Sequence, residues 1–195
     1  MIKKILLIIL YIFTIINCTN NSRNIKVING GVFENNRYVG ISTEKLIDVD
    51  PCNIIYNGVP FTGIGVKLIK GRYVSDIRYE DGCAKQWRYY WDNGNLKELE
   101  VGSCCSEIWY SETYSEEGFL IEIFDGEITK TFYKDGNIKT ESVWGCMMGC
   151  PRDYHKEFYE NGQLKLYKKF DGTFEESFNL TCWDHHGNEI NCHSN

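Results

Sequence analysis

The sequence predicts an all-β fold: an elongated antiparallel meander of successive β-hairpins in one twisted sheet. Aromatic residues make up 14% of the 195 residues, and aromatic side chains favour strands. Past residue 20, apolar and polar residues alternate with a period of two, as at Trp87, Tyr89 and Trp91, and no long segment has a helical period. Short segments that contain Asn-Gly or Asp-Gly recur along the chain, which indicates repeated hairpin turns.

The first residues have the pattern of a targeting signal. Lys3 and Lys4 precede an apolar run, Ile5–Ile16, that is shorter than the roughly 20 helical residues needed to span a bilayer. We therefore expect residues 1–17 to be a signal peptide. Cys18 follows directly, and the segment up to it resembles the lipobox of bacterial lipoproteins, in which cleavage precedes the cysteine and the cysteine is acylated. A plain signal peptide with an incidental Cys18, or an uncleaved short anchor, are the alternatives.

The rest of the chain divides into a tether and a folded domain. Residues 18–30, polar in Thr19–Asn24, are expected to be a lipid-anchored tether, and residues 31–195 the repeat domain. Removing residues 1–17 takes away two lysines and no acid, so the net charge falls from −6 to −8. This acidic balance argues against a nucleic-acid binder. The expected location is the cell envelope with the membrane reached through the anchor, and Thr19 slightly favours the outer membrane because it is not the aspartate of inner-membrane retention signals.

Hairpins are expected throughout the domain. Two N-terminal ones are expected at Val32–Val39 and Tyr56–Gly63. Five later segments share an aromatic residue, a polar turn, a glycine and, in most copies, a Leu or Ile two positions on. The key glycines are Gly94, Gly118, Gly136, Gly162 and Gly187, at spacings of 24, 18, 26 and 25 residues.

Each copy has a physical interpretation. Asn-Gly or Asp-Gly predicts a type I′ turn, in which both central residues have positive φ. The aromatic residue before the glycine and the Leu or Ile after it are expected to meet as a cross-strand pair. Intervening turns are expected at Asp81-Gly82, Val101-Gly102, Asp125-Gly126, Gly145 and Asp171-Gly172.

These residues carry a resemblance to a known family. The segment Tyr56–Gly63 (YNGVPFTG) and the strong copies YWDNGNLK, FYKDGNIK and FYENGQLK resemble the variant class of MORN repeats found in bacterial lipoproteins and in YwqK-family antitoxins. The resemblance covers about residues 54–190. It implies a β-hairpin repeat fold with an interaction surface and no catalytic residues. The copies at Gly118 and Gly187 lack the following lysine, and the cysteine-rich insertions lie outside the pattern.

Nine cysteines fit an oxidising compartment. Apart from Cys18, the possible disulfide residues are Cys52, Cys83, Cys104, Cys105, Cys146, Cys150, Cys182 and Cys192. Proximity favours Cys182 with Cys192, Cys146 with Cys150, and Cys83 with Cys104 or Cys105, which leaves Cys52 for the remaining one. Structural zinc is the rival interpretation, but the usual CxxC knuckle is absent from the sequence, so no metal or other cofactor is expected.

The search for catalytic motifs finds none, and no enzymatic activity is expected. Paired acids such as Glu116-Glu117 are interpreted as solvated surface. The recurring aromatics either fill a shared face of the repeats or expose a stripe for a peptide, glycan or protein. The expected function is therefore a non-catalytic interaction or scaffold module that binds an unknown protein or envelope partner. The alternatives are an immunity or antitoxin-type protein that neutralises a toxin and, less favoured, a glycan-active enzyme.

Overall fold

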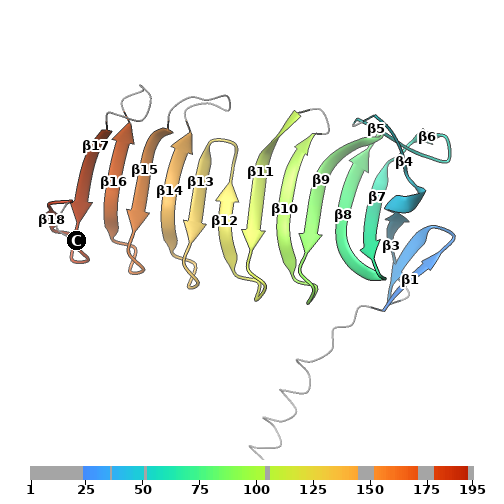
Figure 1. The fold of residues 1–195 in the computed structure, drawn as a ribbon, viewed down its shortest axis with the longest axis horizontal. Coiled ribbons are helices and arrows are strands. Elements are labelled where there is room, and N and C mark those ends of the chain that lie inside the picture. The colour runs from blue at the N-terminus through green and yellow to red at the C-terminus, as the bar shows by residue number, and fades with distance from the viewer. Residues whose placement is uncertain are drawn as a thin grey trace, which may run out of the picture.

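The computed structural model describes residues 24–35, 37–50, 52–103, 106–144, 152–170 and 178–192. Strands make up 68% of the described residues, and Figure 1 shows most of these strands side by side in one long sheet. The expected all-β meander is thus confirmed. The sheet begins at Ile25, so the folded domain starts earlier than the boundary predicted at residue 31. Cys18 lies outside the described residues.

In the described part of the chain the main sheet has 15 strands, ordered along the sheet as they are along the sequence. Its N-terminal strands are β1 Ile25–Ile28, β2 Gly31–Glu34, β3 Arg37–Ser42, β7 Gly63–Ile69, β8 Arg72–Glu80 and β9 Cys83–Tyr90. Its later strands are β10 Leu96–Ser103, β11 Ser106–Tyr114, β12 Leu120–Phe124, β13 Ile128–Phe132, β14 Ile138–Trp144, β15 Arg152–Phe158, β16 Leu164–Phe170, β17 Phe178–Trp183 and β18 Glu189–Ile190. Neighbours are antiparallel except β3 and β7, which pair in parallel through Ile41 and Gly65.

The chain between β3 and β7 forms a second, smaller sheet. It contains the 3-10 turn η1 Thr43–Lys45 and the strands β4 Ile47–Asp50, β5 Asn53–Tyr56 and β6 Val59–Pro60. Ile54 donates its backbone N–H to the carbonyl of Gly82 at 2.9 Å, and Gly82 donates to the carbonyl of Phe61 at 2.9 Å. These bonds join the small sheet to the β8–β9 turn.

The hydrophobic core lies between the two sheets at this N-terminal end. Ile41, Phe61, Tyr79 and Ala84 are buried there. Leu46, Ile54, Tyr56, Ile77 and Trp87 pack around them. Because apolar burial needs two layers, this end is the hydrophobically stabilised part of the described chain.

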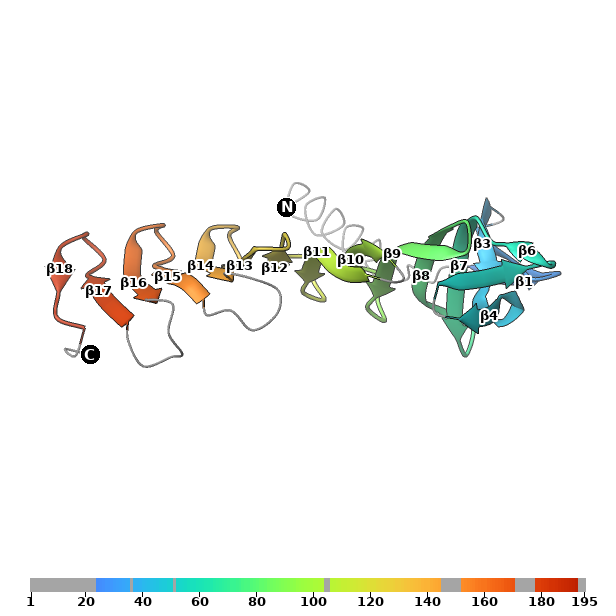
Figure 2. The same cartoon turned by 90° about the horizontal axis from the view of Figure 1, so that it is seen from above.

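From β10 onward the described sheet is a single layer. Figure 2 shows β10 to β18 in single file, with no second sheet beside them. Among the described residues of these strands, Cys182 is the buried hydrophobic one, at 9% exposure. Both faces of this part, which we call the repeat array (β10–β18), are therefore open along most of its length.

All five repeat glycines lie in hairpin turns, but the turns are not of type I′ as predicted. Gly94 has a φ of +87°, whereas Asn93 does not have positive φ. Gly94 N–H donates to the Trp91 carbonyl and Trp91 N–H donates to the Asn95 carbonyl, each at 2.9 Å. This is a three-residue loop in which a type I turn is followed by a left-handed glycine. True double-positive turns occur instead at Asn29-Gly30, Asn57-Gly58, Lys70-Gly71 and Asp81-Gly82.

The register places the expected cross-strand pairs together. In four copies, the aromatic residue four positions before the glycine faces the Leu or Ile two positions after the same glycine. These pairs are Tyr90–Leu96, Tyr114–Leu120, Phe132–Ile138 and Phe158–Leu164. The fifth copy differs, because Trp183 faces Glu189.

The intervening turns are only partly as predicted. Asp125 N–H donates to the Ile128 carbonyl around Gly126, so a turn lies there. Val101-Gly102 is not a turn, because both residues lie inside β10 where the register shifts. Gly102 therefore lies at a shift in strand register and not at a turn that reverses the chain. Gly145 and Asp171-Gly172 lie outside the described residues.

Candidate functional site

The turn edge of the repeat array is held together by hydrogen bonds from one repeat to the next. The aromatic residue three positions before the glycine donates to a backbone carbonyl of the following turn. The bonds are Trp91 Nε1 to Tyr114 O at 3.1 Å, Tyr133 Oη to Phe158 O at 2.7 Å, and Tyr159 Oη to Trp183 O at 2.9 Å. Neighbouring turns are thus linked directly, without a buried core.

Amide side chains form a second set of links at the same edge. Asn95 Nδ2 donates to the Glu116 carbonyl at 2.8 Å, and Asn137 Nδ2 donates to the Glu160 carbonyl at 2.8 Å. The Asp or Asn before the glycine closes its own loop, as when Asp135 Oδ1 accepts from Asn137 N–H at 3.0 Å. The recurring polar residues of the motif are therefore explained by stacking of the turns.

The two weaker copies of the motif use a different device. At Gly118 the Ser115 hydroxyl accepts from Phe119 N–H at 3.1 Å, and at Gly187 the Asp184 carboxylate accepts from Asn188 N–H at 2.9 Å. Both residues occupy the aromatic position of the strong copies. The Gly118 turn contacts the next one through Lys134 Nζ, 4.8 Å from the centroid of the Phe119 ring.

One face of the sheet carries a row of charged side chains that crosses many strands. Residues paired in register lie on the same face. The row, which we call the central row, contains Asp76, Arg88, Leu99, Glu112, Ile123, Lys130, Glu141, Lys156 and Tyr167. Its three carboxylates stand on β8, β11 and β14, and tyrosine hydroxyls donate to each of them.

Asp76 is the most buried of the three, with 2% of its residue surface exposed. Arg88 Nε lies 2.7 Å from Oδ1, and the hydroxyls of Tyr73 and Tyr90 donate to Oδ2 at 2.9 and 2.8 Å. Burial, followed by the charge of Asp76, raises the pKa of Tyr73. This carboxylate is fully compensated within the fold.

Glu141 is compensated by lysines. Lys156 Nζ lies 2.9 Å and Lys130 Nζ 3.6 Å from its carboxylate oxygens, and Tyr154 Oη donates at 2.9 Å. Burial acts to raise the pKa of Glu141, but the hydrogen bonds from Lys156 and Tyr154 and the two lysine charges outweigh it, so the pKa is lowered.

Glu112 is arranged differently. The hydroxyls of Tyr110 and Tyr114 donate to its two carboxylate oxygens, and its neighbours in the row are Leu99 and Ile123. No ion pair joins Glu112 to a cation among the side chains that the structure describes. The hydrogen bond to Glu112, with burial, raises the pKa of Tyr110 to about 12, and burial with the same type of bond raises that of Tyr114 to about 12.

Sequence reasoning missed this site. It interpreted acidic residues beside turns, such as Glu116-Glu117, as solvated surface. The available signal was Tyr-x-Glu-x-Tyr at residues 110–114, since a period of two puts all three side chains on one face.

On the other face of the sheet, a serine, a histidine and a glutamate form a chain of side-chain contacts. Ser142 Oγ lies 2.7 Å from His155 Nδ1, and His155 Nε2 lies 3.6 Å from Glu157 Oε1. Ser142 is paired with both Thr129 and His155 in the middle of the sheet, so backbone N–H groups beside it are engaged in strand pairing. Without such donors an acyl-transfer oxyanion would not be stabilised, and we interpret the group as a hydrogen-bonded chain between strands.

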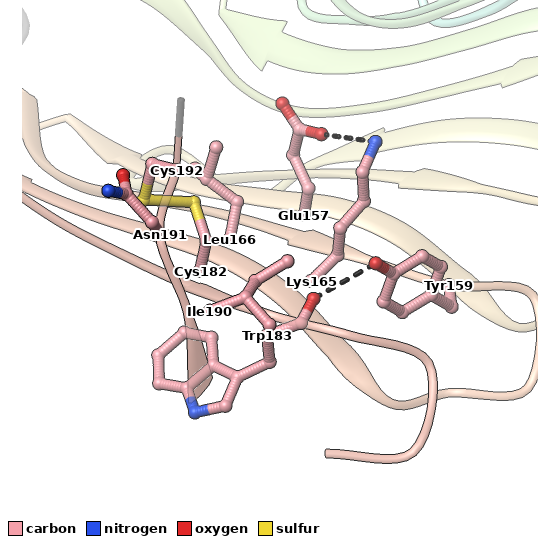
Figure 3. Close-up of a pocket in the computed structure, with 9 residues that line it drawn as sticks. All are labelled: Glu157, Tyr159, Lys165, Leu166, Cys182, Trp183, Ile190, Asn191 and Cys192. Atoms are coloured by element: carbon pink, nitrogen blue, oxygen red, sulfur yellow. Dashed lines mark hydrogen bonds and ion pairs between the residues drawn. A yellow bond between two sulfur atoms is a disulfide. The ribbon is translucent and has the colours of Figure 1, made fainter. Parts of the chain in front are cut away.

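A shallow pocket lies at the C-terminal end of the array (Figure 3), with a volume of about 110 Å³. The Cys182–Cys192 disulfide, with Cα atoms 5.3 Å apart, forms one side, and a Glu157–Lys165 ion pair at 3.3 Å stands at another. Small-molecule sites usually measure about 300–1,000 Å³. The pocket is therefore too small to be the main functional site.

The remaining predicted residues are placed as follows. Cys182 and Cys192 form the predicted disulfide, and Cys52 and Cys83 are also disulfide-bonded. Cys104, Cys105, Cys146 and Cys150 lie outside the described residues. Within the described ranges, no group of three or more His, Cys, Asp or Glu side chains could hold a metal ion.

Comparisons with known proteins place the chain in no family. No family model matches it, and no curated protein matches it. The likeness to MORN-variant repeats thus stays a prediction from the repeated turn motif. No helix within the described residues is sufficiently long and apolar to cross a membrane.

Proposed function

We propose that this protein is a lipid-anchored cell-envelope protein whose repeat array is a non-catalytic surface for binding another protein. The observation that supports binding most strongly is the single-layer array, with open faces on described strands β10–β18. A repeat sheet of this kind offers a long binding surface whose shape is set by nearest-neighbour contacts.

Exposed apolar side chains indicate which part of this surface binds the partner. On the array, the exposed large apolar residues are Ile108 at 36%, Trp109 at 46%, Phe119 at 39%, Ile121 at 42% and Leu180 at 36%, and all but Leu180 belong to β11, β12 or the turn between them. Exposed apolar surface is typical of interaction sites, and four of these five residues share one hairpin. We therefore place the binding surface around the β11–β12 hairpin, which also carries Glu112.

The anchor is supported by the sequence: a basic start, a short apolar run and Cys18 directly after it. Cells that express the wild type and a Cys18→Ala variant should be grown with radioactive palmitate and then fractionated. We expect label and membrane association for the wild type only. Equal labelling of the variant would refute the anchor.

The binding surface is tested in cells by a photo-crosslinking amino acid at Ile121, with the same residue at Val59 of the small sheet as the control. Val59 is more exposed, at 60%, so chance collisions should favour it. We expect a discrete protein adduct from position 121 and none from position 59. Adducts of equal yield at both positions, or none at position 121, would contradict the proposed surface.

A further inference from the structure

We propose that Glu112 is the anchor for an arginine side chain of the bound protein. This inference rests on the proposed binding surface around the β11–β12 hairpin and names the chemistry of its partner. It starts from the charges of the central row. Asp76 has Arg88 at 2.7 Å and Glu141 has Lys156 at 2.9 Å, whereas Glu112 stands between Leu99 and Ile123.

An unmatched carboxylate in half-apolar surroundings is costly unless a cation or strong donors reach it. The tyrosine hydroxyls of Tyr110 and Tyr114 supply two donors and no charge. A cation from the partner would give Glu112 the opposite charge that Arg88 already gives Asp76 and Lys156 gives Glu141. The face at Glu112 is open, so the cation can come from outside.

The geometry favours arginine over lysine. An ionised carboxylate has about four lone-pair positions, and the two hydroxyls occupy one on each oxygen. One position on each oxygen is left, which matches the parallel N–H pair of a guanidinium. Tyr110 and Tyr114 lie on either side of Glu112 along the strand, and guanidinium groups also favour tyrosine rings.

The surroundings fit a protein rather than a free ion. Ile108 and Ile121 lie on the same hairpin as Glu112 and expose 36% and 42% of their surface, and apolar contacts around a central charged pair are typical of interaction hot spots. A metal ion is disfavoured because the described residues bring no third acidic, cysteine or histidine ligand to Glu112. The net charge of −6, or −8 after signal-peptide removal, steers basic partners toward the chain.

The proposal is tested with the full chain in detergent micelles and the peptide acetyl-Thr-Val-Arg-Val-Thr-amide. Two otherwise identical peptides are compared with it. The citrulline peptide keeps the planar shape of arginine without its charge, and the lysine peptide keeps the charge without the planar group. Binding is followed by amide NMR shifts of Tyr110, Glu112 and Tyr114. We expect the arginine peptide to bind about tenfold or more tightly than the citrulline peptide, with lysine between them.

Two variants locate the effect. Glu112→Gln should remove the preference for arginine over citrulline. Glu100→Gln is the matched control, because Glu100 is also half-buried and hydrogen-bonded to a tyrosine but lies on the opposite face, one position along from Leu99. It should leave the preference unchanged.

Equal binding of the arginine and citrulline peptides to the wild type would overturn the proposal, and this comparison needs no variant to fold. So would an unchanged preference in Glu112→Gln, or no shift at Glu112 at millimolar peptide. The wider proposal is tested separately by the crosslink at position 121. A crosslink whose yield is the same with Glu112→Gln would retain the binding surface and remove the arginine anchor.

Discussion

The Tyr159 hydroxyl donates a hydrogen bond to the backbone carbonyl of Trp183 at 2.9 Å, across a sequence separation of 24 residues. Trp91 and Tyr133 make the equivalent bond to their own next turns. An array without a second layer cannot rely on a buried core. These bonds between turns, together with strand pairing, stabilise it instead.

Tyr159→Phe should therefore lower the free energy of unfolding by about 0.5–1.5 kcal/mol, the usual net value of one hydrogen bond. Tyr167→Phe is the matched control, since the Tyr167 ring lies in the same part of the sheet, 6.1 Å from that of Tyr154. Urea denaturation of both variants measures the difference. Equal loss in both would mean that the Tyr159 hydroxyl does not link the turns.

Gly136 tests the turn type. It has a φ of +89°, and a Cβ placed there would meet no atom within 4 Å, so the cost of a side chain is conformational only. Gly136→Ala should cost about 1–2 kcal/mol, and Gly136→Asn less, because Asn enters the left-handed region more readily. Thermal denaturation would rank the two, and an Ala variant as stable as the wild type would contradict the left-handed glycine.

The Cys182–Cys192 disulfide closes a loop with a sequence separation of 10 around the last hairpin. Replacing both cysteines by serine should destabilise the chain by about 2–3 kcal/mol, mainly because the unfolded state gains freedom. Differential scanning calorimetry of the double variant under oxidising conditions measures this. A transition temperature unchanged from the wild type would show that this hairpin unfolds independently of the measured transition.

Glu141 should make the free energy of unfolding depend on pH in the acidic range. Its pKa is lowered from the ordinary 4.5 in the folded chain, chiefly by Lys156 and Tyr154 acting against burial. The stabilisation is then present above the unfolded pKa and is lost as pH falls through the folded one. The difference in unfolding free energy between the wild type and Glu141→Gln should shrink as pH falls below about 4.5.

The control for this pH dependence is Glu127→Gln, which removes one negative charge from an exposed residue of the β12–β13 turn. Its difference from the wild type should change less with pH over the same interval. A larger change for Glu127 than for Glu141 would contradict the assignment.

The hairpins could be predicted from the sequence because alternation and Asn-Gly or Asp-Gly act locally. The turn type could also have been predicted from these segments, but the Asn-Gly or Asp-Gly dipeptide alone wrongly predicted type I′ turns at the five repeat glycines. At Asn57-Gly58 the paired residues Tyr56 and Val59 flank the dipeptide directly, which requires a two-residue loop. At Gly94 the paired residues are Tyr90 and Leu96, which leaves room for a longer one. The position of the apolar pair, rather than Asn-Gly itself, therefore determines the loop.

The central row could not be predicted in the same way. Its alignment across strands depends on register shifts beside the turns, such as the one between Thr113 and Tyr114 against β12. One shift moves a side chain to the opposite face. That Glu112 faces Leu99 and Ile123, while Glu141 faces two lysines, follows only from the assembled sheet.

The central claim is that β11 lies in a single layer and that one of its faces binds a basic partner. Hydroxyl-radical footprinting, read by mass spectrometry, tests it most directly with and without the arginine peptide. In the free chain, Tyr110 and Trp109, which point to opposite faces, should both be oxidised, while buried Tyr79 and Phe61 should be protected. The peptide should protect Tyr110 and leave Trp109 reactive. Protection of Tyr110 in the free chain to the level of Tyr79, or no change on adding the peptide, would contradict the account.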